Sequence, residues 1–248
     1  MNTDTLLFIA AFFGAYTVQA VTGFAGNVLC MPAGLHLIGL ATSVVVLNVM
    51  GFINCGQLAL MNRKHVNRPE LLKMTLVMLI FMLVGIYLDT ILPLDILVVV
   101  YGVITLIIGL KNLIFRNRRF LPEWVLWFVL AGAGLMQGMF VAGGALLVIY
   151  AIQKFADTAE FRATLSALWT VLNFIYGCIA FVQGHFTMEV GLILLFTIPL
   201  GFLATFLGNR ISARIDKEVF LRIVYALLVV IGAILLFTSE ASPLFISL

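Results

Sequence analysis

Charged side chains are scarce in this 248-residue chain. Lys, Arg, Asp and Glu make up only 10% of the residues, whereas soluble domains average about 25%. Hydrophobic residues make up 63% and the mean hydropathy is +1.19, so the few charges cannot cover a water-facing surface. This excludes a soluble domain and a disordered chain. At roughly 20 residues per membrane helix, about ten crossings are possible. We expect an all-α, polytopic integral membrane protein.

Cysteines and catalytic motifs are also scarce. The three cysteines, Cys30, Cys55 and Cys178, are scattered through apolar segments and form no CxxC pair. This argues against a disulfide scaffold, a redox centre and a thiolate metal site, and favours a packing role for all three. The Ser/His/Asp, Cys/His, HExxH and P-loop patterns are missing as well. We therefore expect no enzymatic activity, no cofactor and no bound metal.

The basic residues that are present fall into four clusters separated by long uncharged stretches. The clusters are Arg63, Lys64, Arg68 and Lys73; Lys111, Arg116, Arg118 and Arg119; Lys154 and Arg162; and Arg210, Arg214, Lys217 and Arg222. Such clusters between apolar segments are typical of cytoplasmic loops that follow the positive-inside rule. We expect the lipid bilayer, and not a nucleic acid, to surround this chain.

The sequence contains signs of an internal duplication. An offset of 118 positions places Gly14, Gln19, Gly26 and Leu29 on Gly132, Gln137, Gly144 and Leu147. With short gaps the match continues, and Ala41-Thr42 falls near Ala163-Thr164. The series predicts a first repeat over 1–111, a basic cytoplasmic linker over 112–123 and a second repeat over 124–248.

Each half contains five apolar segments. They lie near 6–22, 26–40, 42–61, 74–89 and 96–111, and near 124–140, 143–153, 163–183, 188–208 and 219–238. The loop after the third segment is basic in the first half, whereas the loop after the fourth is basic in the second half. If both termini lie outside, all 14 basic residues fall on the cytoplasmic side. This inversion of the charge bias predicts inverted repeats, a plan that recurs in secondary transporters.

The first two segments of each half are short and meet at a Gly-rich break. They form either two tilted spans or a hairpin that enters the membrane and returns, and both choices place the charges identically. The prediction is therefore about 8–10 transmembrane or re-entrant helical segments. The sequence carries no indication of the oligomeric state.

The two breaks, at 22–27 and 138–144, are the candidate substrate site. Non-helical backbone at membrane depth is tolerated only where it is buried in protein or lines a cavity. A short helix begins after each break, and its free N–H groups favour an anion. The alternative is that these glycines serve close helix packing. The candidate substrate-binding residues are Gln19, Thr22, Gly23, Gly26, Asn27, Gln137, Gly138, Gly143 and Gly144.

No Asp, Glu, Lys or Arg is placed centrally in any predicted segment, which argues against cation carriers and carboxylate proton relays. A small anion suits the remaining neutral donors best. An anion that leaves a negative cell interior gains about 2.3 kcal/mol per 100 mV, so export needs no coupled ion. Two alternatives remain open, a neutral-solute permease or channel and a non-transporting membrane scaffold.

The Gly-rich stretches resemble a known family. Residues 19–27 (QAVTGFAGN), followed by Pro32, and residues 137–144 (QGMFVAGG) are similar to the paired motifs of the TauE/SafE sulfite exporters. Asn27 stands where the family pattern has glycine, and Tyr150 stands where the second copy would have proline. The resemblance implies transport of sulfite, organosulfonates or related sulfur-containing anions across a bacterial cytoplasmic membrane.

Overall fold

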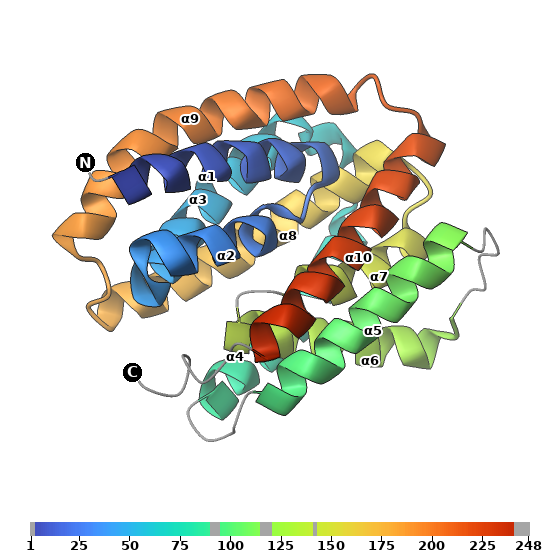
Figure 1. Cartoon of the computed structure of the whole chain (residues 1–248). Coiled ribbons are helices and arrows are strands. Elements are labelled where there is room, and N and C mark those ends of the chain that lie inside the picture. The colour runs from blue at the N-terminus through green and yellow to red at the C-terminus, as the bar shows by residue number, and fades with distance from the viewer. Residues whose placement is uncertain (1–2, 90–94, 115–120, 141–142, 241–248) are drawn as a thin grey trace.

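The described residues fold into ten α-helices and one 3₁₀ turn and contain no strand. A computed structural model describes residues 3–89, 95–114, 121–140 and 143–240. The elements, seen in Figure 1, are α1 Thr3–Thr22, α2 Gly26–Ile38, α3 Leu40–Met61, η1 Arg63–His65, α4 Arg68–Asp89, α5 Asp95–Ile114, α6 Glu123–Phe140, α7 Gly144–Lys154, α8 Thr158–Val182, α9 Met188–Ser212 and α10 Lys217–Glu240. Each predicted apolar segment corresponds to one of these helices.

Among the described residues, five helices are long and apolar enough to cross a membrane, namely α1, α3, α4, α8 and α9. Large apolar side chains point outward from them, among them Ile80 on α4 and Leu195 on α9, which are 60% and 65% exposed. Such a surface is stable against lipid and not against water. The all-α, polytopic membrane fold predicted from composition is therefore confirmed.

The short helices α2 and α7 pack back against the helices that precede them. A Cβ added at Gly34 of α2 would lie 3.3 Å from the Phe8 ring at the start of α1. In the second half, Lys154 at the end of α7 forms an ion pair with Glu123 at the start of α6. Each pair is thus an antiparallel hairpin. At 1.5 Å per residue, α2 and α7 are about 20 and 16 Å long, too short for a hydrocarbon core of roughly 30 Å.

The main helix contacts follow a regular scheme. Helix α1 packs on α9, α4 on α6, α3 on α8 and α5 on α10, and within the hairpins α1 packs on α2 and α6 on α7. These pairs repeat between the two halves of the chain. If each helix is exchanged for its counterpart in the other half, five helices away, the same set of pairs results. Glycines permit the close approaches: a Cβ added at Gly109 of α5 would meet Val229 of α10, and one at Gly232 of α10 would meet Leu106 of α5.

The basic loops gather at one end of the bundle, which we call the basic end. Asn62, next to the basic η1, donates to Asn209 Oδ1 near the end of α9 over 3.2 Å. The Asn67 N–H donates to Thr164 Oγ1 near the start of α8 over 3.0 Å. The Lys154–Glu123 ion pair brings the end of α7 to the start of α6. Arg116, Arg118 and Arg119 of the predicted linker lie outside the described residues.

Two helices begin at least five residues before the predicted segments. Helix α4 starts at Arg68 and α8 starts at Thr158, where the predictions were 74–89 and 163–183. In α8 the cause is a side-chain cap, because Asp157 accepts a hydrogen bond from the Glu160 N–H over 3.0 Å and so fixes the first turn. Arg162, expected in a solvated loop, is therefore part of a membrane-crossing helix and is only 5% exposed.

Candidate functional site

The tips of the two hairpins meet in the middle of the bundle. The first tip turns at Gly23, whose φ of +88° lies in the left-handed region that favours glycine. Its N–H still closes the last turn of α1 by donating to Gln19 O over 2.6 Å. At the second tip, a Cβ added to Gly144 would lie 3.3 Å from Phe24 O, so the hairpins are in direct contact. Residues 141–142 of the predicted second break lie outside the described residues.

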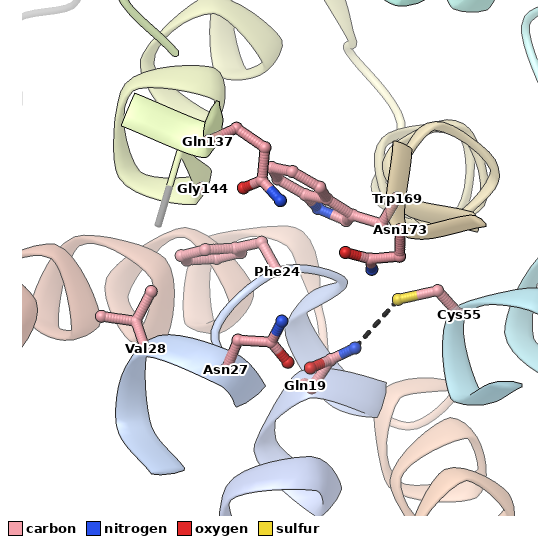
Figure 2. Close-up of a pocket in the computed structure, with 9 residues that line it drawn as sticks. All are labelled: Gln19, Phe24, Asn27, Val28, Cys55, Gln137, Gly144, Trp169 and Asn173. Atoms are coloured by element: carbon pink, nitrogen blue, oxygen red, sulfur yellow. Dashed lines mark hydrogen bonds between the residues drawn. The ribbon is translucent and has the colours of Figure 1, made fainter. Parts of the chain in front are cut away.

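A small cavity lies between the tips, with a volume of about 20 Å³. This is room for about one water molecule. Both halves of the chain contribute to it, as Figure 2 shows, and its lining is Gln19, Phe24, Asn27, Val28, Cys55, Gln137, Gly144, Trp169 and Asn173. No residue of this lining carries a charged side chain. Trp169 is the twelfth of the 25 residues of α8, which places the cavity near the middle of a membrane-crossing helix.

The two glutamines of the repeat occupy similar places. Both are buried, and each lies beside the start of the short helix of its own hairpin. The Gly143 N–H donates to Gln137 Oε1 over 3.2 Å. In the first half, a Cβ added at Gly26 would overlap Gln19 Oε1 and lie 2.8 Å from Gln19 Cβ. Glycine at the start of α2 therefore makes room for Gln19.

Asn27 is held by a residue that the sequence analysis did not single out. The Tyr16 hydroxyl lies 2.7 Å from Asn27 Oδ1 and 2.9 Å from Leu47 O. Because the amide oxygen of Asn27 accepts from Tyr16, its NH₂ group is left to face the cavity (Figure 2). Gln19 is oriented in a comparable way, since its Nε2 donates to Cys55 Sγ over 2.9 Å.

Both short helices start at the cavity without a side-chain cap. The residues before their first turns, Ala25 and Gly143, accept no hydrogen bond with a side chain. Asn27 and Val28 of α2 and Gly144 of α7 line the cavity. The first N–H groups of a helix have no partner within the helix and carry about half a positive charge. Two such termini around one space favour a negatively charged ligand.

The other candidate residues lie beside the cavity or away from it. Thr22 is buried and its hydroxyl donates to Val18 O within α1. Gly23 packs on α8, where an added Cβ would lie 3.3 Å from Arg162 Cα. Gly138 contacts α4, because a Cβ there would overlap Met82 O and lie 2.8 Å from Ile86 N. Gly138 therefore serves the α4–α6 contact and does not line the cavity.

Besides Tyr16, the sequence analysis missed the place of three residues in this region. It did not single out Trp169, and it interpreted Cys55 as a packing residue and Arg162 as part of a loop. The capping residues Asp157 and Glu160 are the sequence signal that would have placed Arg162 inside a helix. No local pattern marks Trp169, because its place depends on the packing of α8 against both hairpins.

The fold and the site are those of a multi-pass helical membrane protein with two hairpins that meet around a polar cavity. The family model described as "Sulfite exporter TauE/SafE" matches residues 7–235 of the 248. The chain therefore belongs to the TauE/SafE family, whose members are transporters and not enzymes. No curated protein and no solved structure matches the chain.

Proposed function

We propose that this chain transports a small sulfur oxyanion, such as sulfite or an organosulfonate, out of a bacterial cell. The observation that carries the proposal is the convergence of two helix N-termini without side-chain caps on one cavity whose lining has no carboxylate. Positive ends of helix dipoles stabilise an anion and repel a cation. Membership of the sulfite exporter family supports a sulfur oxyanion within that class.

The proposed binding groups are the N–H groups of the first turns of α2 and α7 and the side-chain amides around them. Asn27, fixed by Tyr16, donates from its NH₂ group. Gln19 and Gln137 support the starts of the two short helices. Gly26, Gly143 and Gly144 keep the backbone accessible. Within this proposal Thr22 and Gly23 shape the first tip, while Gly138 holds α6 against α4.

The size of the cavity supports transport by alternating access. A space of about 20 Å³ admits one water molecule, whereas sulfite has four heavy atoms, so the lining has to move apart to admit it. The regular scheme of helix pairs supports an inverted duplication of 1–111 and 124–248. In such transporters one repeat moves against the other around a fixed central site. We place the basic end in the cytoplasm and both termini outside.

The first test is thermal stabilisation of the purified protein by sulfite, sulfate, thiosulfate, sulfoacetate, taurine, bicarbonate and chloride, with a neutral sugar as the control. An anion present at 100 times its Kd stabilises the folded state by about 2.7 kcal/mol. The variant Asn27→Leu removes one of the amides that line the cavity and is expected to abolish the stabilisation. Gln183→Leu, at the exposed end of α8, removes an amide outside the cavity and should behave as the unmodified protein.

Flux into liposomes separates this proposal from its alternatives. An anion exporter gives saturable flux that changes with membrane potential, because each charge carries about 2.3 kcal/mol per 100 mV. A neutral-solute permease gives flux that does not respond to the potential, and a scaffold gives none. Either of the latter results, with a correctly folded protein, would refute sulfur-oxyanion export.

A further inference from the structure

One face of α8 carries a row of buried polar side chains. Arg162, Ser166, Trp169 and Asn173 follow one another at spacings of four, three and four residues, which places them on the same face of a helix. Their exposed fractions are 5%, 0%, 6% and 2%. Asn173 Oδ1 accepts a hydrogen bond from Asn48 Nδ2 over 3.3 Å.

Three side chains of this row have a polar atom without a hydrogen-bond partner in the described part of the chain. They are Arg162 Nε, Ser166 Oγ and Trp169 Nε1. The other such atoms among the described residues are dispersed over α3, α4 and α5. Buried polar atoms are nearly always paired in native proteins, so three on successive turns of one helix face indicate a ligand. Guanidinium and indole N–H groups can only donate hydrogen bonds. A ligand that accepts from both, such as an anion, therefore fits this row.

The row leads from the basic end to the cavity. Arg162 lies in the second turn of α8, against the tip of the first hairpin, where an added Cβ of Gly23 would be 3.3 Å from its Cα. Trp169 and Asn173 line the cavity. Asn173 follows Arg162 by eleven positions, a rise of about 16 Å along the helix, which is about half of the hydrocarbon core. The length of the row therefore matches the distance expected between one membrane surface and a central site.

The charge of Arg162 is not neutralised by a carboxylate in the described residues. Its guanidinium donates to Ala20 O, in the last turn of α1, and to Asn209 Oδ1 over 3.1 Å. Both acceptors are neutral. A buried cation with neutral partners attracts an anion strongly, because the protein interior screens charge far less than water does.

We propose that this face of α8 is the path by which the transported oxyanion passes between the basic end and the cavity. Arg162 receives the anion, Ser166 passes it on, and Trp169 donates to it at the cavity. This inference rests on the proposed function and adds the route to it. Because Arg162 also holds Ala20 O, an anion that takes over this guanidinium loosens the tip of the first hairpin from α8.

The positions on α3 that the predicted repeat pairs with this row carry no matching donors. The repeat places Ala41-Thr42 near Ala163-Thr164, so the positions on α3 that correspond to Ser166, Trp169 and Asn173 are Val44, Leu47 and Gly51. None of these side chains can donate a hydrogen bond. The row of donors therefore belongs to the half of the molecule between the cavity and the basic end.

The test compares Trp169→Phe and Ser166→Ala with two matched controls in sulfite-loaded proteoliposomes. Each path variant removes one donor and keeps most of the side-chain volume. A hydrogen bond to an ion is strong enough that losing one should reduce sulfite flux at subsaturating concentration about tenfold. Thr105→Val removes an unpaired buried hydroxyl from α5, and Trp124→Phe removes an indole from an exposed site on α6. Both controls should keep the flux.

Melting temperature is the second readout. If the unpaired atoms of Ser166 and Thr105 are only packing defects, both substitutions raise the melting temperature and neither changes flux, which overturns the path. If the unmodified protein transports sulfite and the path variants match it, the path is overturned while the proposed function stands. If the unmodified protein transports no anion, both the path and the proposed function are refuted. Reduced flux in the path variants alone, with melting temperatures at or above the original, supports the path.

Discussion

A methyl group added at the start of α2 tests the geometry of the central site. In Gly26→Ala the new Cβ would overlap Gln19 Oε1 and lie 2.8 Å from Gln19 Cβ. The amide can rotate away only by giving up its bond to Cys55 Sγ, and Gln19 Cβ itself cannot move without the α1 backbone. Overpacking of this kind costs about 1–3 kcal/mol. Since 1 kcal/mol shifts the melting temperature of a chain this long by about 2–4 °C, we expect a decrease of roughly 2–12 °C.

The matched control is Gly14→Ala on the same helix as Gln19. A Cβ at Gly14 meets no atom within 4 Å, and alanine improves helix propensity by about 0.5–1 kcal/mol, so this variant should melt slightly higher. Adding Gln19→Ala to Gly26→Ala removes the overlapped amide and should recover part of the lost stability. Thermal melting in detergent measures all four proteins. Equal melting temperatures for Gly26→Ala and Gly14→Ala would refute the placement of Gln19 against α2.

Three further experiments test neighbouring features. Tyr16→Phe leaves Asn27 Oδ1 without its donor, which should cost about 1–3 kcal/mol and weaken sulfite binding; unchanged binding by calorimetry would remove Tyr16 from the site. Gly138→Ala places a Cβ over Met82 O and should lower the melting temperature through a cost of about 1–3 kcal/mol, while the folded fraction binds sulfite with the original Kd. A changed Kd would show that Gly138 contributes to the binding site and would refute its assignment to the α4–α6 contact alone. Single cysteines at Lys64 and Arg214 should react with an impermeant maleimide only from the cytoplasm, and one at His185 only from outside; the reverse would refute the orientation.

Much of this fold is accessible from composition and charge alone. The scarcity of charge predicted a membrane protein, and the apolar segments located all ten helices, because a bilayer requires long uncharged runs and puts charges at their ends. The repeat also drew attention to Gln19 and Gln137, which the structure brings to the starts of the two short helices. These features follow from local sequence and from its repetition.

The details of the site depend on contacts that no local pattern encodes. Tyr16 resembles any aromatic residue in an apolar helix, and only the fold places its hydroxyl 2.7 Å from Asn27 Oδ1. Gly138 and Gly143 belong to one Gly-rich stretch, yet the first packs on α4 and the second donates to Gln137. Glycine serves both helix packing and open backbone, and the partner decides between them.

The unpaired donors of α8 connect stability with transport. Each buried donor without an acceptor destabilises the folded protein by about 1–3 kcal/mol, so three of them on one helix face are a substantial cost for a protein of ordinary stability. An anion that accepts from Ser166 and Trp169 removes that cost while it is bound, and the recovered free energy appears as affinity. Substitutions that remove these donors should therefore raise the melting temperature and lower the transport rate. This opposite movement of two measured quantities distinguishes a substrate path from an imperfectly packed helix.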